Sequence, residues 1–440
     1  MNRLKQLWSN MRSNFWFAPS LIVLVSVAFA AALIRADSAG SDRWLAQWPH
    51  LFGAGAEGAR GMMSTIAGSM MSVVGVMFSM ILVVLALASS QYTSRILRNF
   101  MRSRVTQVVL GIFAGIFTYC LIVLRTIRSG EGAFVPGLAV FFGFVLALGG
   151  VGALMFFIHH IASSIQASSI IASVAQETIA AIDRLFPDKL GQGPGEDDEY
   201  PTPRPLSEQN WRTVPAEASG YIQSVNNAAL LRLARDRKTI VSMEQGIGEF
   251  VVQNTTLASI ALEDPPDRET IAALQAAFSI SRHRTVEQDV AFGIRQIVDV
   301  ALKALSPGIV DTTTAIMCVD YLTVILARIA PRQFSSSRRY EKGQLRVIAK
   351  GPSFEDLLGG SFDQIRNSAK GDVAIMSRML GAFQTIASLT GSPKRRQAIR
   401  EQAQWIAELA ERTLESSHDR ARIDTLLARV RDETLEAVPA

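Results

Sequence analysis

Four long apolar runs in the first third of the chain constrain its fold more than any other feature. They cover roughly residues 15–33, 62–88, 107–127 and 134–161, and none contains Asp, Glu or Lys between its ends. A helix needs about 20 apolar residues to cross the hydrocarbon core of a bilayer. Each run is long enough, and a charged fraction of 19% suits a chain with much of its length in lipid. The sequence therefore predicts a transmembrane domain over residues 1–165 that contacts the lipid bilayer.

The basic residues beside these runs predict the orientation. Residues 89–106, between the second and third runs, contain four arginines and no acidic residue. Basic residues also precede the first run, whereas the loop between the first and second runs mixes both signs. Because Lys and Arg are enriched in cytoplasmic loops, we expect a multi-pass protein with both termini in the cytoplasm.

The fourth run continues beyond the length that a membrane requires. No proline interrupts the helical pattern from Gly137 to Phe186, which predicts a helical stalk over residues 166–190. Isoleucines and small residues recur along it with the 3-4 spacing of a coiled coil, at Ile158, Ile161, Ile165, Ser168, Ala172, Ala175 and Ile179. This seam suits either an intramolecular helix pair or close packing of symmetry mates, in which case it faces a shared axis or pore.

The remaining chain predicts three further segments. Residues 191–210 are rich in Pro, Gly and acid, which is typical of a flexible linker. Short β-rich runs over residues 211–264 predict a small β-barrel or sandwich, and residues 265–440 predict a helical bundle. The expected fold class is thus a mostly α membrane protein, with a four-helix transmembrane domain and a cytoplasmic α+β region.

Sequence motifs give little indication of chemistry. The chain has no Walker loop, no G-x-S-x-G and no H-E-x-x-H, so we predict no catalytic residue, no metal ligand and no cofactor. A basic stripe with interleaved aromatics is also missing, which argues against nucleic acid as a partner. Gly111 and Gly115, a G-x-x-x-G in the third run, predict a notch for packing against another helix.

One group of polar residues is a candidate pocket for a small anionic ligand in the cytoplasm. A helix that opens near residue 311 offers free backbone N–H groups, which suit a phosphate or carboxylate. The candidate residues are Arg284, Arg295, Asp299, Ser306, Asp311 and Thr312. A simpler interpretation makes Arg295 and Asp299 a surface ion pair at i,i+4 and Asp311 an ordinary helix cap.

Several stretches carry a resemblance to a known family. They are "SRILRNFMRSRVTQVVLGIF", "FVPGLAVFFG", "SGYIQSV" and "RTVEQDVAFGIRQIVDVALKALSPGIVDTTTA". With this spacing the chain, over about residues 15–430, resembles a bacterial family of predicted membrane proteins that carries a domain of unknown function. The resemblance implies a bacterial inner membrane protein. The sequence departs from the family pattern at Val310-Asp311-Thr312, where the resemblance leads us to expect Asn-Asp-Pro.

Three classes of function fit these features. The leading expectation is a homo-oligomeric ion channel or pore-like assembly, self-associated through the seam and gated by the cytoplasmic domain. The alternative is a nonconducting membrane-anchored sensor or scaffold, which the large cytoplasmic region supports. A secondary transporter comes third, because such carriers usually hold ionisable residues in mid-membrane and these runs have no acid there.

Overall fold

The structure is a computed structural model that describes residues 16–38, 55–91, 104–129, 134–164, 166–186 and 209–435, apart from residues 333, 335–336 and 342. The chain divides into two compact units, Met1–Ser169 and Ile170–Ala440. Each unit is described by itself. The chain is mostly helical, with its sheets in the second unit, which agrees with the predicted fold class.

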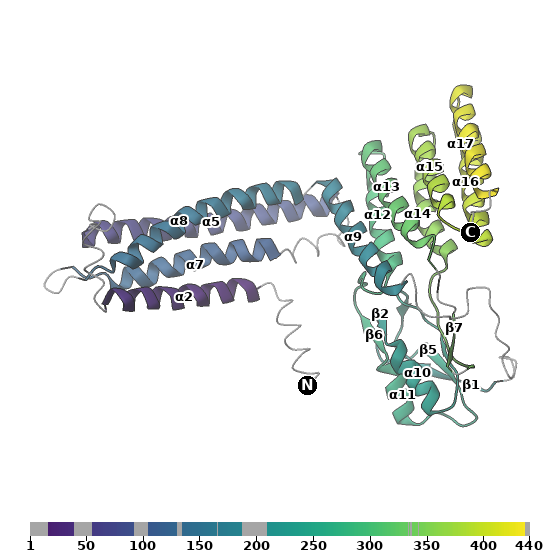
Figure 1. Cartoon of the computed structure of the whole chain (residues 1–440), viewed down its shortest axis with the longest axis horizontal. Coiled ribbons are helices and arrows are strands. Elements are labelled where there is room, and N and C mark those ends of the chain that lie inside the picture. Colours follow the sequence, from purple (N-terminus) through teal and green to yellow (C-terminus); the bar gives the residue numbers. More distant parts are fainter. Residues whose placement is uncertain are drawn as a thin grey trace. The chain divides into compact units, whose positions relative to one another are not determined.

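The first unit contains four apolar helices in its described part: α2 (Phe17–Ser38), α5 (Ala56–Gln91), α7 (Arg104–Thr126) and α8 (Gly137–Ser164) (Figure 1). Each includes one of the four apolar runs, and each is long and apolar enough to cross a membrane. α7 is the most deeply buried of them, because α2, α5 and α8 all pack against it.

The two glycines of the G-x-x-x-G are the point of closest approach between α7 and α2. A Cβ at Gly111 would lie 2.8 Å from Cδ1 of Ile22, and one at Gly115 would lie 2.5 Å from Oγ of Ser26. Side chains at these positions would force the two helices apart. The prediction of a helix-packing notch is therefore confirmed, with α2 as the helix that fills it.

One carboxylate links the end of α2 to the start of α8. Asp37 is 8% exposed, and its two oxygens accept hydrogen bonds from the backbone N–H groups of Leu138 (3.2 Å) and Ala139 (3.1 Å). The Tyr119 hydroxyl of α7 donates to the carbonyl of Ala139 at 2.7 Å. The two bonds to Asp37 use N–H groups that a helix leaves unpaired in its first turn. Together with the Tyr119 bond they join α2, α7 and α8.

A fifth helix also meets the length and composition of a membrane span. This is α13 (Thr312–Ile329), which belongs to the second unit and packs against α12 (Val290–Ala304) and α15 (Val373–Ser388). Its charged residues Asp320 and Arg328 both form ion pairs with residues of that unit. The apolar residues of α13 thus contribute to the core of the second unit.

The long fourth helix of the prediction is divided in two. α8 ends at Ser164 and α9 (Ala167–Leu185) begins three residues later, with Gln166 in a bend. The expectation of an uninterrupted helix to Phe186 was therefore wrong. Since neither proline nor glycine lies at the junction, helix propensity alone gives no sign of this break.

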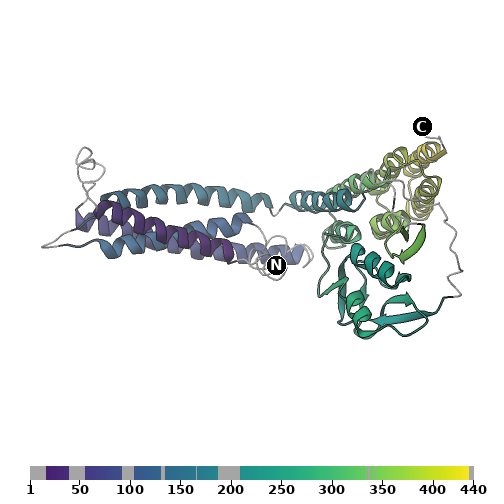
Figure 2. The same ribbon diagram turned by 60° about the horizontal axis from the view of Figure 1, so that its bottom comes forward.

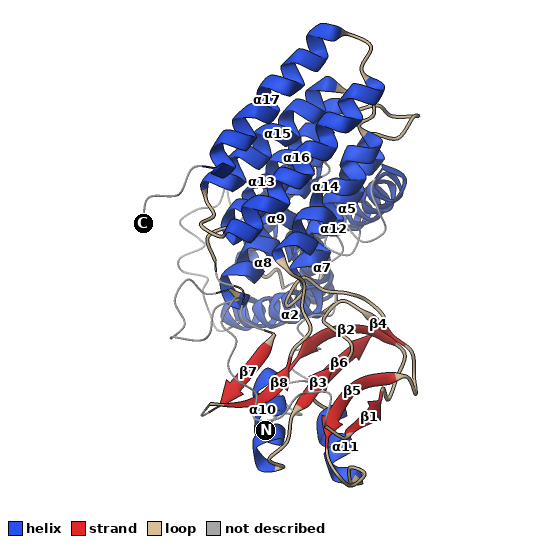
Figure 3. Ribbon diagram, turned by 90° about the vertical axis from the view of Figure 1, so that its right-hand side faces the viewer, coloured by secondary structure: helices blue, strands red, loops and turns tan. Residues whose placement is uncertain are grey.

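The second unit begins with two β-sheets. Their strands are β1 (Trp211–Pro215), β2 (Gly220–Val225), β3 (Val241–Met243), β4 (Phe250–Val251), β5 (Thr256–Ala261), β6 (Phe278–Ser281), β7 (Arg338–Glu341) and β8 (Gln344–Ile348). One sheet has the order β1-β5-β3-β8-β7 and the other the order β4-β2-β6 (Figure 3). Both orders are open, so neither sheet closes into a barrel. Three strands come from beyond the predicted module boundary at residue 264, and the predicted helical segment therefore supplies part of the sheets.

Two short helices complete this β-rich part. α10 (Asn227–Asp236) and α11 (Arg268–Gln275) bury Leu230 and Leu274 in the same apolar core as Ile260 of the larger sheet and Ile222 of the smaller one. The strands gather in one part of the unit and the later helices in another (Figure 2).

Six helices form two layers in the second unit. One layer holds α12, α14 (Phe354–Ser368) and α16 (Pro393–Thr413), and the other holds α13, α15 and α17 (Ser417–Leu435). Within each layer the helices pack side by side in chain order (Figure 1). Contacts between α12 and α13 and between α16 and α17 join the two layers into one helical stack.

Candidate functional site

The helix α12 is the centre of the site that contains two of the predicted residues. Its N-cap is Asp289, whose Oδ1 accepts the N–H of Phe292 at 2.9 Å. The same carboxylate forms two hydrogen bonds with Arg284, at 2.8 Å from Nε and 2.9 Å from Nη2. Asp289 is only 3% exposed in its side chain, so this is a buried, two-pronged ion pair at a helix N-terminus.

A glycine lets the loop between β3 and β4 lie against this ion pair. Gly248 has φ +85, and a Cβ there would overlap the Asp289 carboxylate and approach Arg284 Nη2 to 2.7 Å. The Arg284 guanidinium also lies over the ring of Phe292, 5.1 Å from its centroid. The sheets and the helical stack are therefore joined at the start of α12.

A cleft of about 260 Å³ lies between α12 and α14, and we call it the α12–α14 cleft. Arg284 and Arg295 line it, and Arg295 is paired with Asp299 at 2.8 Å. Opposite them α14 contributes polar and small residues: Asp356, Gly359, Gly360, Asp363 and Gln364. With cations on one side and carboxylates on the other, the cleft can bind a small ligand that carries both charges.

The opposite side of α12 holds α9 at very close range. A Cβ at Gly293 would overlap Oγ1 of Thr178 and lie 2.9 Å from its Cγ2. Thr178 is fully buried and donates to the carbonyl of Val174 at 2.7 Å. α9 therefore packs on α12 at the one position where α12 has no side chain.

The C-terminal end of α9 is fixed by two arginines. Arg332, 4% exposed, donates from Nη1 to the carbonyls of Ile182 (3.1 Å) and Phe186 (2.6 Å). Arg328 and Arg332 both pair with Asp183. The hydrogen bond from Arg328, together with that from Arg332, holds the pKa of the Asp183 carboxyl below its usual value. A cation at a helix C-terminus also complements the helix dipole.

The other predicted pocket residues lie at the far end of α12. Ser306 and Asp311 follow its last turn, about 22 Å along the axis from its start at 1.5 Å per residue. Asp311 caps α13 and bonds Thr314, which lowers the pKa of Asp311, while Thr312 donates to Asp372 at 3.0 Å. The structure therefore places Arg284 and Arg295 in one cleft, with Asp299 paired to Arg295, and separates them from Ser306, Asp311 and Thr312.

The predicted axis-facing seam is divided between different surroundings. Ile158 is 46% exposed on α8 and Ile161 is buried, while Ile165 lies outside the described residues. On α9, Ser168, Ala172 and Ile179 are half-buried and Ala175 is buried. The buried residues of α9 are Ile171, Val174, Ala175, Thr178, Ala181 and Ile182. The centre of this buried face lies about 110° round the helix from Ala172 and Ile179.

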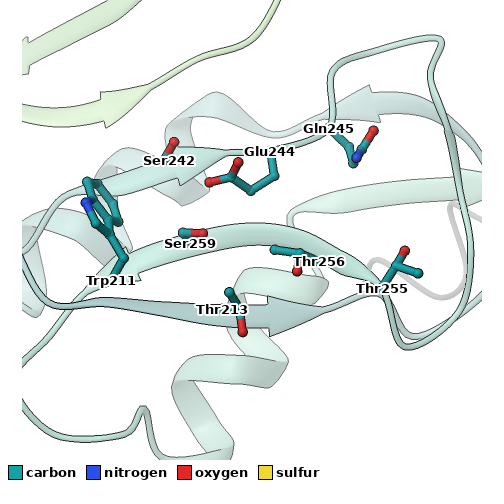
Figure 4. A pocket seen from close by; sticks show the side chains of 8 residues that line it. All are labelled: Trp211, Thr213, Ser242, Glu244, Gln245, Thr255, Thr256 and Ser259. Carbon is teal, nitrogen blue, oxygen red and sulfur yellow. The ribbon is translucent and has the colours of Figure 1, made fainter. Parts of the chain in front are cut away.

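A second concave surface, which we call the sheet groove, lies on one face of the larger sheet (Figure 4). Thr213, Ser259 and Ser242 come from β1, β5 and β3 and are direct cross-strand neighbours. Trp211, Glu244, Gln245, Thr255 and Thr256 complete the lining of this cavity of about 660 Å³. Such a row of hydroxyls beside an indole can hydrogen-bond and stack on a neutral polar ligand.

The sequence analysis missed the sheet groove. The signal that was present is a serine between two apolar residues in "VSM" and in "ASI", which places each serine on the opposite face of its strand from its neighbours. Pairing of β1, β5 and β3 across the sheet is a long-range contact, and strand alternation alone does not specify it. Among the residues that the structure describes, no group of three His, Cys, Asp or Glu side chains is arranged to hold a metal.

Several apolar helices of spanning length and a second α+β unit together define a multi-pass membrane protein. The chain belongs to the DUF2254 family of predicted membrane proteins, whose model matches residues 12–385.

The similar proteins are mycobacterial. The uncharacterized protein Mb1321c of Mycobacterium bovis (strain ATCC BAA-935 / AF2122/97) is 30% identical over 435 residues, which cover 96% of this chain and 81% of the relative. The uncharacterized protein Rv1290c of Mycobacterium tuberculosis (strain ATCC 25618 / H37Rv) has the same identity and coverage. No solved structure matches the chain.

Proposed function

We propose that the protein is a membrane-anchored sensor, in which a ligand in the α12–α14 cleft alters α12 and, through α9, the membrane helix α8. The observation that carries this proposal is the packing of Thr178 on Gly293. It makes α9 part of the unit that contains the cleft. Only two residues separate α9 from α8, so a displacement of α9 has a short covalent path to the membrane.

The geometry favours a sensor over the channel that the seam suggested. The channel hypothesis needs the small residues of α9 to face symmetry mates, but α9 buries Ala175 and Val174 within its own unit. The surface of α9 that remains available for self-association is the half-buried side that carries Ala172 and Ile179. A homo-oligomer is therefore no longer required to explain the pattern of small residues.

The membrane arrangement of this proposal has four spans in a bacterial inner membrane. We assign α2, α5, α7 and α8 to the bilayer, and we assign α13 to the second unit because its apolar residues pack there. The arginines of residues 89–106 support cytoplasmic termini. The cleft then faces the cytoplasm, where its ligand is a small metabolite with an anionic group.

Filling the cleft tests this coupling without knowledge of the ligand. Gly360 lines the cleft, and a Cβ there meets nothing within 4 Å, so Gly360→Phe places a ring in the cleft with little strain at the Cβ. Gly381→Phe is the control, because its Cβ also meets nothing within 4 Å and it lies on α15.

The readout is amide hydrogen exchange of the full chain in lipid nanodiscs. We expect Gly360→Phe to change exchange in α9 and at the end of α8, and Gly381→Phe to leave both unchanged. Equal exchange in both variants would contradict the proposal. Stable oligomers together with ion flux in proteoliposomes would favour the channel instead.

A further inference from the structure

A further cleft of about 670 Å³ lies on the layer formed by α13, α15 and α17. It is lined by Ile316 of α13, by Ala374, Ser377 and Arg378 of α15, and by Arg422, Thr425, Leu426 and Arg429 of α17. We call it the arginine cleft. Its volume lies in the range of small-molecule sites, about 300–1,000 Å³.

The charge in this cleft is strongly one-sided. Three guanidinium groups line it, and its lining within the described chain includes no acidic residue. Arg378 is compensated by an ion pair with Asp320 of α13, whereas no ion pair involves Arg422 or Arg429 in the part of the chain that the structure describes. Two positive charges are therefore left without a counter-charge at one surface depression.

The spacing along α17 places these two arginines on the same face of the helix. Arg422 and Arg429 are seven residues apart, which is two turns and about 10 Å along the axis. Thr425 lies between them on the lining. Guanidinium groups bind phosphate and carboxylate through paired hydrogen bonds, so this row can hold two anionic groups of one ligand.

The base of the cleft has an unused hydrogen-bonding group. Oγ of Ser377 is buried from solvent and has no hydrogen-bond partner among the described residues. A buried polar group without a partner costs free energy, and native structures leave few of them. Ile316 and Leu426 beside it provide apolar surface for the uncharged part of a ligand.

We propose that the arginine cleft is a binding site for a small polyanion with phosphate or carboxylate groups. Arg422 and Arg429 bind two of its anionic groups, and Arg378 lines the cleft from α15. The Ser377 hydroxyl hydrogen-bonds the ligand at the base. This site is independent of the α12–α14 cleft and of the proposed sensor function.

The test uses the full chain in detergent, with inorganic tripolyphosphate and citrate as probes for the two chemistries. Calorimetry should detect saturable binding that weakens as the salt concentration rises. Arg422→Gln combined with Arg429→Gln should weaken binding by about tenfold or more, since charge-assisted hydrogen bonds are lost. The probe with the lower Kd identifies the phosphate or the carboxylate class.

A matched control removes the same charge elsewhere. Arg232 and Arg268 are exposed on α10 and α11, and Arg232→Gln combined with Arg268→Gln should leave affinity within about twofold of the parent. Equal losses in both double variants, or no saturable binding by either probe, would overturn the proposal. Tighter binding of a hexaglutamate peptide than of either probe would also overturn it, in favour of a protein partner.

Ser377→Ala separates a ligand role from a structural one. Because the hydroxyl has no partner to lose, the thermal midpoint without a probe should stay the same or rise. Affinity for the probe should nevertheless fall several-fold. Unchanged affinity in this variant would contradict a ligand bound at the base of the cleft.

Discussion

Gly293 of α12 lies directly against Thr178 of α9, so close that any Cβ at position 293 would overlap the threonine hydroxyl oxygen. Thr178 is fully buried, and its hydroxyl is already bonded to the carbonyl of Val174. The threonine side chain therefore has little freedom to move away. This contact is one place where α9 is held, and the contacts of Arg328 and Arg332 at its C-terminal end are another.

Gly293→Ala should loosen α9. Overpacking of a close contact costs about 1–3 kcal/mol, against a gain of about 1 kcal/mol from the better helix propensity of alanine. We expect faster amide hydrogen exchange throughout α9. Gly381→Ala is the control, because its Cβ meets nothing within 4 Å, and it should stabilise the protein by up to about 1 kcal/mol. Slower or unchanged exchange in α9 of Gly293→Ala would show that the contact relaxes freely.

Arg284→Gln should destabilise the second unit strongly. It leaves the Asp289 carboxylate, 3% exposed, without its counter-charge, and breaking a buried pair from one side costs about 3–5 kcal/mol. Arg295→Gln removes the same charge from a pair whose arginine is 36% exposed, and it should cost no more than about 1 kcal/mol. Denaturant unfolding of both variants measures the difference. Similar losses would mean that Asp289 finds another donor.

The attachment of α9 should weaken at low pH through Asp183. Its hydrogen bonds, first with Arg328, lower the pKa of this carboxyl in the folded protein. The stabilisation is therefore complete above the unfolded pKa of about 3.9 and is lost as pH falls through the lower folded value. Asp183→Asn should lack this pH-dependent stabilisation, because the amide does not ionise. The amide hydrogen exchange rates of α9 in the parent and in Asp183→Asn should differ at pH 6 and should converge as the pH falls below about 4. A difference that stays constant with pH would mean that another group causes the pH dependence.

The apolar helices were predictable because apolar length is a local property of sequence. Each of the four apolar runs largely coincides with one of the helices α2, α5, α7 and α8, and Gly111 and Gly115 correctly indicated a packing notch. The sheets were less predictable, since β3 pairs in parallel with β8, about a hundred residues later in the chain. β8 (Gln344–Ile348) also lies within residues 265–440, for which we predicted a helical bundle.

In the candidate site, too, the contacts between residues close in sequence were predictable and those between distant residues were not. Arg295 and Asp299 are close in sequence, and their i,i+4 pair is present as the simpler interpretation expected. On α9 the predicted seam shares Ala175 with the buried face, while Ser168, Ala172 and Ile179 are half-buried. Thr178 faces α12 because Gly293 leaves room for it there. Gly293 lies 115 positions further along the chain, so the sequence around Thr178 could not indicate this contact.

Reporter fusions should establish the orientation. The arginines of residues 89–106 predict that fusions at Gly53 and Gly130 report from the periplasm and that those at Arg98 and Asn210 report from the cytoplasm. Gly53, Arg98 and Gly130 lie outside the described residues. A periplasmic signal at Asn210 would contradict both the predicted cytoplasmic location of the second unit and the proposed ligand class.

Val310→Asn should stabilise the turn between α12 and α13. Val310 has φ +50, a left-handed conformation that is strained for a β-branched side chain and well tolerated by asparagine. The side chain is 69% exposed, so the change loses little apolar burial. Since left-handed backbone costs most residues about 1–2 kcal/mol, we expect a gain on the order of 1 kcal/mol. Asparagine is also the residue that the resemblance led us to expect here.

Ile309→Asn is the matched control for this change. Ile309 precedes Val310, is 47% exposed and has no positive φ, so the same polar substitution relieves no strain there. The thermal midpoint should rise in Val310→Asn and stay level or fall in Ile309→Asn. The thermal midpoint should rise less in Val310→Gly than in Val310→Asn, because glycine adds conformational entropy to the unfolded chain. A fall in Val310→Asn comparable to that in Ile309→Asn would mean that the valine side chain stabilises this turn by more than its backbone strain.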